Sequence, residues 1–258
     1  MRIITWNANR VGRWDLLWAD PLVVSLNWDV ICLQETGNPD TANWAHVSGP
    51  VWTPVAAQRD TIESHVRRRY TYQPPNYNIT VHIVHTEWAN RQKNHLVFIT
   101  QTYASWAAEL GGDMSDRPVM GIKARLTWPG VARDILIGCV HIVADQAKSP
   151  QEVSALVPAI NSMCQAAGAQ GWLLVGDFNC SPAKLRNEAQ VSLGTWFPPT
   201  RTQQSVADPI DYVVVDPGLY QAVMATPNIG GNWEQGTARS DHTLFRYTQI
   251  NGPALQIL

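Results

Sequence analysis

Acidic, amide and imidazole side chains stand at the borders of apolar, strand-like segments throughout this chain. In chain order these groups are Glu35, His141, Asp177, Asn179, Asp211, Asp241 and His242. Because each lies where a strand-like segment begins or ends, one face of a sheet sandwich could gather all of them. Carboxylates, an amide and two imidazoles that converge in this way suit metal-assisted cleavage of a phosphodiester bond.

Oxygen donors near the first two apolar segments suit a hard cation. Glu35 ends a nearly continuous apolar run, so it is either a solvated carboxylate at a strand end or a ligand for Mg²⁺. Mg²⁺ prefers one or two carboxylates and keeps waters for a substrate phosphate. Asn7, which follows Trp6 at another strand end, is either a turn-capping amide or part of the same site.

The motif Gly176-Asp177-Phe178-Asn179 is more specific. Gly-Asp with Asn two residues later is a good turn sequence, so local structure alone can explain it. Both Asp177 and Asn179 would nevertheless lie at the carboxyl end of a strand, where open α/β layers place their chemistry. We therefore favour a catalytic role for this motif.

Two histidines complete the set. His141 closes an apolar run, where a histidine can simply be a hydrogen-bonded surface residue. His242 directly follows an acid, and Asp211 opens an apolar run upstream. A buried Asp oriented on an imidazole raises its basicity and fixes its tautomer. Together with the acids, both histidines are predicted to be catalytic.

Short strands must position these groups. Segments rich in Ile, Val and Leu and bounded by Gly, Pro, Asn and Asp predict strands over 2–7, 29–35, 80–85, 95–100, 118–126, 134–141, 172–177, 210–215 and 243–247. The runs that end at Glu35 and Asp177 are almost entirely apolar, which indicates strands covered on both faces.

Helices are predicted between some of these strands. Ser149-Pro150-Gln151-Glu152 is typical of a capping box with proline at the first helical position, and Gly168 is expected to end that helix. Pro158 inside it is expected to cause a kink. Further helices are predicted over 14–28, interrupted by a proline, and from Ser181-Pro182. The order of elements predicts one domain over residues 1–258, a two-sheet sandwich flanked by helices.

Length and composition limit the possible classes. The 258 residues can bury a large core, and 19 basic against 21 acidic side chains argue against a strongly basic coat for nucleic acid. Twelve tryptophans suit a packed β core. The four cysteines show no zinc-ligand spacing, and Cys32 and Cys139 are expected to be core residues. No leader typical of secretion and no run long enough to span a bilayer is visible in this numbering.

Several motifs in order carry a family resemblance. They are Thr5-Trp6-Asn7, Gln34-Glu35, Asp116-Arg117-Pro118-Val119, His141, Gly176-Asp177-Phe178-Asn179, Ile210-Asp211-Tyr212 and Ser240-Asp241-His242. From residue 3 to 245 the chain resembles the endonuclease/exonuclease/phosphatase superfamily, the group of deoxyribonuclease I. Within it, segments 116–122 and 176–185 are similar to the catalytic B subunit of cytolethal distending toxin.

The resemblance implies an α+β fold, a four-layer α/β/β/α sandwich, and a metal-dependent phosphodiesterase, most simply a DNA endonuclease. It also implies a metal site. Glu35, with Asn7 and Asp241, would hold Mg²⁺, or alternatively Mn²⁺ or Ca²⁺, against a phosphate oxygen. His242, oriented by Asp211, would activate water or bind the phosphate.

The remaining implied roles concern the phosphoryl group and the partners. Asp177 and Asn179 would position the water and the phosphoryl group, while His141 would assist departure of the leaving oxygen. Arg117 would pair with phosphate, as a planar guanidinium does well. DNA would be the substrate, and the toxin likeness would imply partner subunits, secretion and action in a host nucleus. The segment 67–72, rich in Arg and Tyr, is either a loop that grips the DNA backbone or a solvated basic loop.

Two other functions stay open. One is a lipid-directed phosphoesterase of the phosphoinositide phosphatase or sphingomyelinase type. Inositol-polyphosphate phosphatases usually carry an Arg shortly after the Gly-Asp-x-Asn motif, where this chain has Cys180-Ser181-Pro182, and this difference counts against that type. A sphingomyelinase stays open, because segments like Asp211-Tyr212-Val213 and Ser240-Asp241-His242 occur there too. The other is a catalytically silent binding module on the same fold, against which the complete set of acids and histidines argues.

Overall fold

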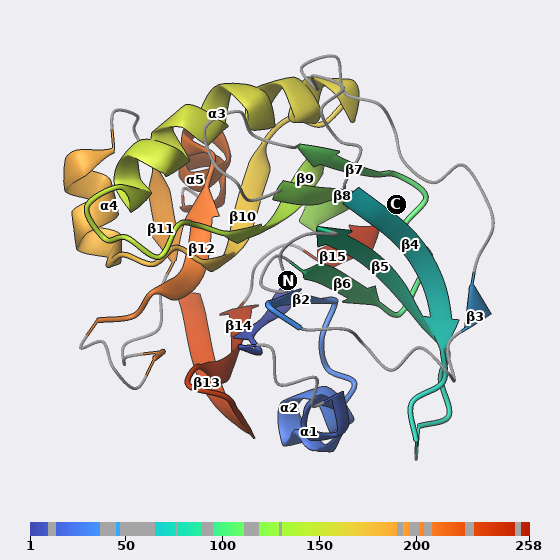
Figure 1. Ribbon diagram of the computed structural model, residues 1–258. Helices are drawn as coiled ribbons and strands as arrows, with labels where there is room; N and C mark the ends of the chain where they lie inside the picture. The colour runs from blue at the N-terminus through green and yellow to red at the C-terminus, as the bar shows by residue number, and fades with distance from the viewer. Residues whose placement is uncertain are drawn as a thin grey trace.

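The chain folds into two β-sheets that pack face to face, with helices on their outer sides (Figure 1). The structure, a computed structural model, describes residues 1–9, 14–36, 45–46, 65–75, 77–88, 95–110, 119–128, 131–189, 193–196, 202–203, 208–224, 230–250 and 254–258.

The first sheet has the strand order β13-β14-β1-β2-β6-β5-β4-β3. Its strands are β1 (Arg2–Asn7), β2 (Val30–Gln34), β3 (Ala45–His46), β4 (His65–Tyr72), β5 (Val81–Trp88), β6 (Leu96–Thr100), β13 (Gly230–Arg239) and β14 (Thr243–Ile250). The β1–β2 pair is parallel, whereas β14 runs antiparallel to β1.

The second sheet has the order β11-β12-β10-β9-β8-β15, and β7 also pairs with β8. Its strands are β7 (Ala107–Leu110), β8 (Val119–Trp128), β9 (Val131–His141), β10 (Trp172–Asp177), β11 (Gly194–Trp196), β12 (Asp211–Val215) and β15 (Ala254–Ile257). Here β9 and β10 are parallel, and β12 is antiparallel to β10.

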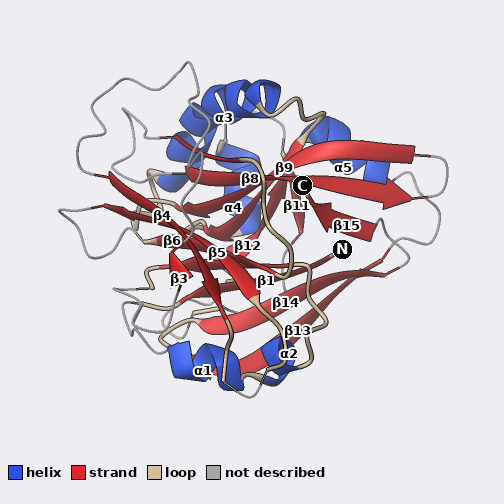
Figure 2. Ribbon diagram, turned by 90° about the vertical axis from the view of Figure 1, so that its right-hand side faces the viewer, coloured by secondary structure: helices blue, strands red, loops and turns tan. Residues whose placement is uncertain are grey.

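The helices form the two outer layers, as Figure 2 shows. They are α1 (Trp14–Ala19), α2 (Pro21–Val24), α3 (Ser149–Ala166), α4 (Pro182–Glu188) and α5 (Pro217–Met224). α1 and α2 lie against the first sheet, and α3 and α4 lie against the second. The predicted α/β/β/α sandwich is therefore confirmed. Among the described residues, no helix has both the length and the apolar character needed to cross a membrane.

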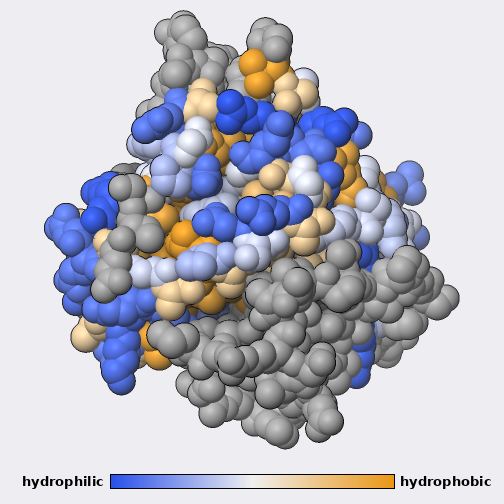
Figure 3. All heavy atoms as spheres, turned by 90° about the horizontal axis from the view of Figure 1, so that it is seen from above, coloured by the Kyte–Doolittle hydropathy of each residue, from blue (hydrophilic) through white to orange (hydrophobic). Residues whose placement is uncertain are grey.

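Three apolar clusters hold these layers together. The cluster between the sheets contains side chains from both, for example Cys32, Phe98, Ile137 and Val175. In the second cluster, α3 and α4 pack on the second sheet. In the third, α1 and α2 pack on the first sheet. The four cysteines are buried and unbridged, and the prediction that Cys32 and Cys139 are core residues is confirmed. Seen from above in Figure 3, the described surface carries hydrophilic residues interspersed with apolar ones, while α3 buries Val153, Leu156, Ile160 and Met163 underneath.

Helix α3 differs from its prediction at the start and agrees at the end. No capping box forms: the N-cap is Lys148, which makes no side-chain capping bond, and Ser149 already lies in the first turn. At the other end Gly168 takes φ +61°, and Ala169 N–H donates to the Cys164 carbonyl as in a Schellman motif. Pro158 stays inside the helix.

Residues 67–72 form most of strand β4, so the prediction of a basic loop is wrong. Arg69 is 4% exposed; its guanidinium donates to the Ala104 carbonyl and lies 5.1 Å from the ring centre of Tyr103. This arginine is therefore part of the packed structure. The sequence did not predict strands β3, β4, β7, β11, β13 and β15, nor helix α5.

Strand register brings the ends of both sheets to one side of the sandwich. Asn7 pairs with Gln34 across β1 and β2, so Glu35 follows directly beside Asn7. Asp177 pairs with His141 on one side and with Asp211 on the other. The polar groups identified at segment borders therefore lie near one another.

Gly176, the residue before Asp177, is required by close packing of strands. It has φ +148°, a region that residues with a side chain rarely adopt. A Cβ atom at this position would lie 2.0 Å from the carbonyl oxygen of Val140 on β9. Only glycine allows β10 to approach β9 this closely.

A buried histidine pair predicts a pH dependence of stability. His85 is fully buried and stacks on His95, with Nε2 and Nδ1 3.1 Å apart. Burial, together with His95 and Arg68, lowers the pKa of His85 to about 3. The unfolded chain takes up a proton near pH 6.5 that the folded protein excludes. The contribution of His85 to the unfolding free energy is therefore complete above pH 6.5 and declines as the pH falls towards 3.

We expect wild type to lose about 2 kcal/mol more unfolding free energy than His85→Gln between pH 7.5 and 5. Urea denaturation at both pH values measures this difference, and the variant corrects for all other titrating groups. An equal pH dependence in the two proteins would contradict the buried, neutral state of His85.

Candidate active site

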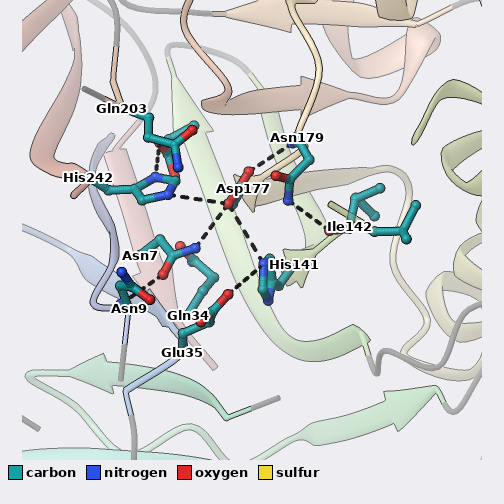
Figure 4. Close-up of polar contacts among 12 residues, drawn as sticks. Asn7, Asn9, Gln34, Glu35, His141, Ile142, Asp177, Asn179, Gln203 and His242 are labelled. Atoms are coloured by element: carbon teal, nitrogen blue, oxygen red, sulfur yellow. Dashed lines mark hydrogen bonds and ion pairs between the residues drawn. The ribbon is translucent and has the colours of Figure 1, made fainter. Parts of the chain in front are cut away.

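Asp177 is the central residue of the polar cluster (Figure 4). Its carboxylate is 1% exposed, and Oδ2 accepts a hydrogen bond from Asn7 Nδ2 at 2.9 Å. Oδ1 accepts from the backbone N–H of Asn179 at 2.8 Å. The Nε2 atoms of His141 and His242 lie 3.7 and 3.8 Å from Oδ2. One carboxylate thus joins groups from both sheets.

His242 is held by a second acid. Its Nδ1–H donates to Asp211 Oδ2 at 2.8 Å, which leaves Nε2 facing Asp177. Asp211 is itself fixed, because the hydroxyl oxygen of Thr202 accepts the backbone N–H groups of both Ile210 and Asp211 at 3.0 Å. The imidazole therefore has a defined orientation.

The electrostatics of the cluster favour a charged imidazole and a readily protonated carboxylate. Burial lowers the pKa of His242, but Asp211, Asp177 and Asp241 outweigh it and raise that pKa to about 9. Burial and the neighbouring Asp211 raise the pKa of Asp177 well above its usual range. At neutral pH His242 is thus an imidazolium beside a carboxyl group that binds protons unusually well.

A second histidine–acid pair lies on the other side of Asp177. His141 Nε2 is 3.0 Å from Glu35 Oε1, and both residues are buried. Glu35 adopts a left-handed backbone with φ +49°, as does Asn179 with φ +51°. Such conformations are uncommon outside glycine and cluster at functional sites. The turns that follow β2 and β10 thus bring these two side chains to the site.

Asn7 connects three parts of the cluster. Its Nδ2 donates to Asp177, and its Oδ1 accepts from the backbone N–H of Asn9 at 2.9 Å. The Ser240 hydroxyl donates to the Asn7 carbonyl at 2.7 Å and accepts from His242 N–H at 3.0 Å. Ser240 thereby joins the end of β1 to the start of β14.

The donor set fits a hard divalent cation. Glu35, Asn7 and Asp241 offer only oxygen atoms, which Mg²⁺, Mn²⁺ and Ca²⁺ prefer. Asn7 is the last residue of β1, and Glu35 directly follows the paired strand β2. The Asn7 Oδ1 atom retains a lone pair beyond its bond to Asn9. Among the described residues, Asp177, Asp211 and His242 also form a compact group whose ligand atoms lie within 4.8 Å of one another. A buried cluster of acids and histidines is thus present.

The structure brings most of the predicted site residues together. The buried cluster is formed by His141, His242, Asp211, Asp177, Asn7 and Glu35, and the half-buried Asn179 borders it. The Asp241 side chain is 42% exposed at its edge, 4.0 Å from His242 Nε2, and accepts from Gln203. Arg117 lies outside the described residues.

Sequence reasoning missed two supporting residues, Thr202 and Gln203. They lie in a polar stretch without periodicity, and Gln203 pairs with His242 only as an isolated bridge. Their position became evident only from the folded chain.

This chain has the same fold as several proteins of known structure. The cytolethal distending toxin of Haemophilus ducreyi matches with a TM-score of 0.66 and 20% identity, over 96% of this chain and 97% of that one. The toxin of Actinobacillus actinomycetemcomitans gives 0.68 and 18% over the same shares. The APE2 catalytic domain of Xenopus laevis gives 0.52 and 14%, over 98% and 93%. The search of curated protein sequences yields no match.

Sequence comparison assigns the family. The profile of the Endonuclease/Exonuclease/phosphatase family matches residues 4–242, a span that contains every residue of the cluster described above. The chain therefore belongs to the Endonuclease/Exonuclease/phosphatase family.

Proposed function

We propose that this chain is a Mg²⁺-dependent phosphodiesterase that cleaves DNA internally, as a nuclease of the cytolethal distending toxin type. The observation that carries the proposal is the Asp177 carboxylate, which lies between two imidazoles that each have their own acid. Family membership supports hydrolysis of a phosphoester. The resemblance of segments 116–122 and 176–185 to the catalytic subunit of that toxin favours a nuclease, and the toxin structures share the fold of this chain.

His242 supplies positive charge to the phosphate. Asp211 raises the pKa of His242, so its Nε2–H is present at neutral pH and can donate to a non-bridging oxygen. A preorganised donor of this kind stabilises charge that develops on the phosphoryl group. Of the two roles that the resemblance allowed, phosphate binding therefore fits better than activation of water.

Asp177 serves as the general base. Its raised pKa lets it take a proton from water while the new P–O bond forms, and the P–O bond to the leaving group breaks. Hydrogen bonds from Asn7 and the Asn179 backbone hold the carboxylate in place for this step. On the other side, His141 Nε2 can donate to the leaving oxygen.

The cation would be held by Glu35, Asn7 and Asp241, and when bound it would neutralise charge on the phosphate. Mn²⁺ and Ca²⁺ are alternatives with the same preference for oxygen. Toxin partner subunits, secretion and action in a host nucleus follow from the same likeness and belong to this proposal.

The catalytic histidines can be tested with supercoiled plasmid. Wild type should nick it in Mg²⁺, and EDTA should stop the reaction. His141→Ala and His242→Ala should each lower the rate by about 10²–10⁴-fold, because each removes a proton donor. His82→Ala is a matched control, since His82 is a half-buried histidine of β5 with no part in the proposed chemistry. Wild-type nicking by both site variants would refute the mechanism.

The role of Asp211 predicts a change in the charge of His242. In metal-free Asp211→Asn, the pKa of His242 should fall by about 1–3 units, because the carboxylate that favours the imidazolium is gone. NMR titration of the imidazole measures this, and the nicking rate at pH 7 should fall with it. A His242 pKa that stays near 9 would show that Asp211 does not control the charge.

A substrate panel separates the nuclease from the lipid-directed alternatives. Plasmid, phosphatidylinositol trisphosphate and sphingomyelin should be compared in one Mg²⁺ buffer, with His242→Ala as the blank. We expect hydrolysis of the plasmid to exceed that of either lipid. Faster release of phosphate or phosphocholine from a lipid would reassign the substrate, and no hydrolysis of any of the three would support a binding module.

A further inference from the structure

Ser149 and Glu152, the two ends of the expected capping box, form hydrogen bonds with the turn that precedes α3. Glu152 is buried in the first turns of α3, and its Oε2 accepts the backbone N–H of Val143 at 2.7 Å. The Ser149 hydroxyl lies 3.1 Å from the Val143 carbonyl and 2.7 Å from that of Asp145, and can donate to either. Both side chains therefore hold the turn that follows His141, rather than the end of their own helix.

The β9–β10 ladder ends just before this turn. Ile142 N–H donates to the Asp177 carbonyl at 2.8 Å, which continues the parallel pairing of His141 with Asp177. The next carbonyl, that of Ile142, accepts instead from Asn179 Nδ2 at 2.8 Å, as Figure 4 shows. The orientation of the Asn179 amide thus depends on where the Ile142 carbonyl points.

The Ile142 carbonyl and the Val143 N–H belong to one peptide group. This peptide is trans, so the two groups lie in one plane and point in opposite directions. Glu152 binds the N–H end, and Asn179 binds the carbonyl end. A peptide fixed at its N–H end cannot turn its carbonyl away from Asn179. Hydrogen bonds at both ends of one amide also polarise each other.

We propose that Glu152 is a positioning residue that orients the Asn179 side chain through the Ile142–Val143 peptide. Ser149 supports this role by restraining Val143 and Asp145. The link to catalysis rests on the proposed phosphodiesterase function, in which Asn179 helps to place the phosphoryl group. The orientation of Asn179 itself does not depend on that function.

The side-chain orientation of Asn179 can be set by residues outside its own turn. Its backbone N–H already donates to Asp177, and its φ of +51° places the side chain on a turn rather than in a ladder. Among the described residues, the bond to the Ile142 carbonyl is the one that fixes its amide group. Release of that bond would free the amide to rotate while leaving Asp177 and the sheet unchanged.

The experiment compares four variants by steady-state kinetics on plasmid and by NMR of the Asn179 side-chain amide. Glu152→Ala removes the acceptor, whereas Glu152→Gln keeps a carbonyl oxygen at the same place. Ser149→Ala loosens the same turn. Ser154→Ala is the matched control, because it removes a serine hydroxyl of the same helix that donates to the Pro150 carbonyl of α3 at 2.8 Å.

Glu152→Ala should lower kcat by about tenfold or more with KM within about twofold, because misplacement affects the reacting geometry rather than binding. Exchange of the Asn179 amide protons should become faster. Ser149→Ala should change both readouts in the same direction but less, and Glu152→Gln and Ser154→Ala should resemble wild type. A role limited to stability would lower the melting temperature without moving kcat or the amide exchange.

Wild-type kcat and unchanged amide exchange in folded Glu152→Ala would overturn the inference, as would a Glu152→Gln variant that is as impaired as Glu152→Ala. If Glu152→Ala does not fold, Ser149→Ala decides by the same two readouts. If wild type hydrolyses no phosphodiester, the proposed function fails, and amide exchange in the variants alone decides whether Glu152 orients Asn179.

Discussion

The buried carboxylate of Asp177 is the interaction on which the rest of the site depends. A carboxylate removed from water is costly unless neighbouring groups compensate for the lost solvation. Here the compensation comes from neutral donors, the Asn7 amide and the Asn179 N–H, and from two imidazoles. These groups belong to β1, to the turn after β10, to β9 and to the segment before β14. Solvation of one acid therefore requires the ends of β1, β9 and β10 and the start of β14 to meet at one place.

Sheet geometry meets that requirement without help from the helices. Parallel pairing aligns the ends of β1 with β2 and of β9 with β10, and face-to-face packing brings the two pairs together. Strands β12 and β14 run antiparallel to β10 and β1 and therefore begin at this same edge. Asp211 and His242, at the starts of these two strands, thus lie beside the ends of the others. The helices pack on the outer faces of the sheets, and α3 contacts the turn after His141 through Glu152.

The fold and most of the site could be predicted because their signals are local. The runs that end at Glu35 and Asp177 are apolar on both faces, and each polar group directly borders such a run. β4 and β13 carry weaker signals, because their residues are largely polar, charged or glycine and owe their strand conformation to partners distant in the chain. Ser149 and Glu152 match a capping pattern, yet stronger partners in the preceding turn take their side chains. No sequence pattern encodes that competition.

Gly176, the residue before Asp177, also determines how close His141 and Asp177 lie to each other. β9 and β10 carry His141 and Asp177 at paired positions, and the carbonyl of Val140 occupies the space that a side chain at position 176 would need. Any side chain there would push the two strand ends apart and widen the gap between the imidazole and the acid. The absence of a Cβ atom at position 176 therefore keeps the His141 imidazole within 3.7 Å of the Asp177 carboxylate, the separation on which the proposed reaction depends.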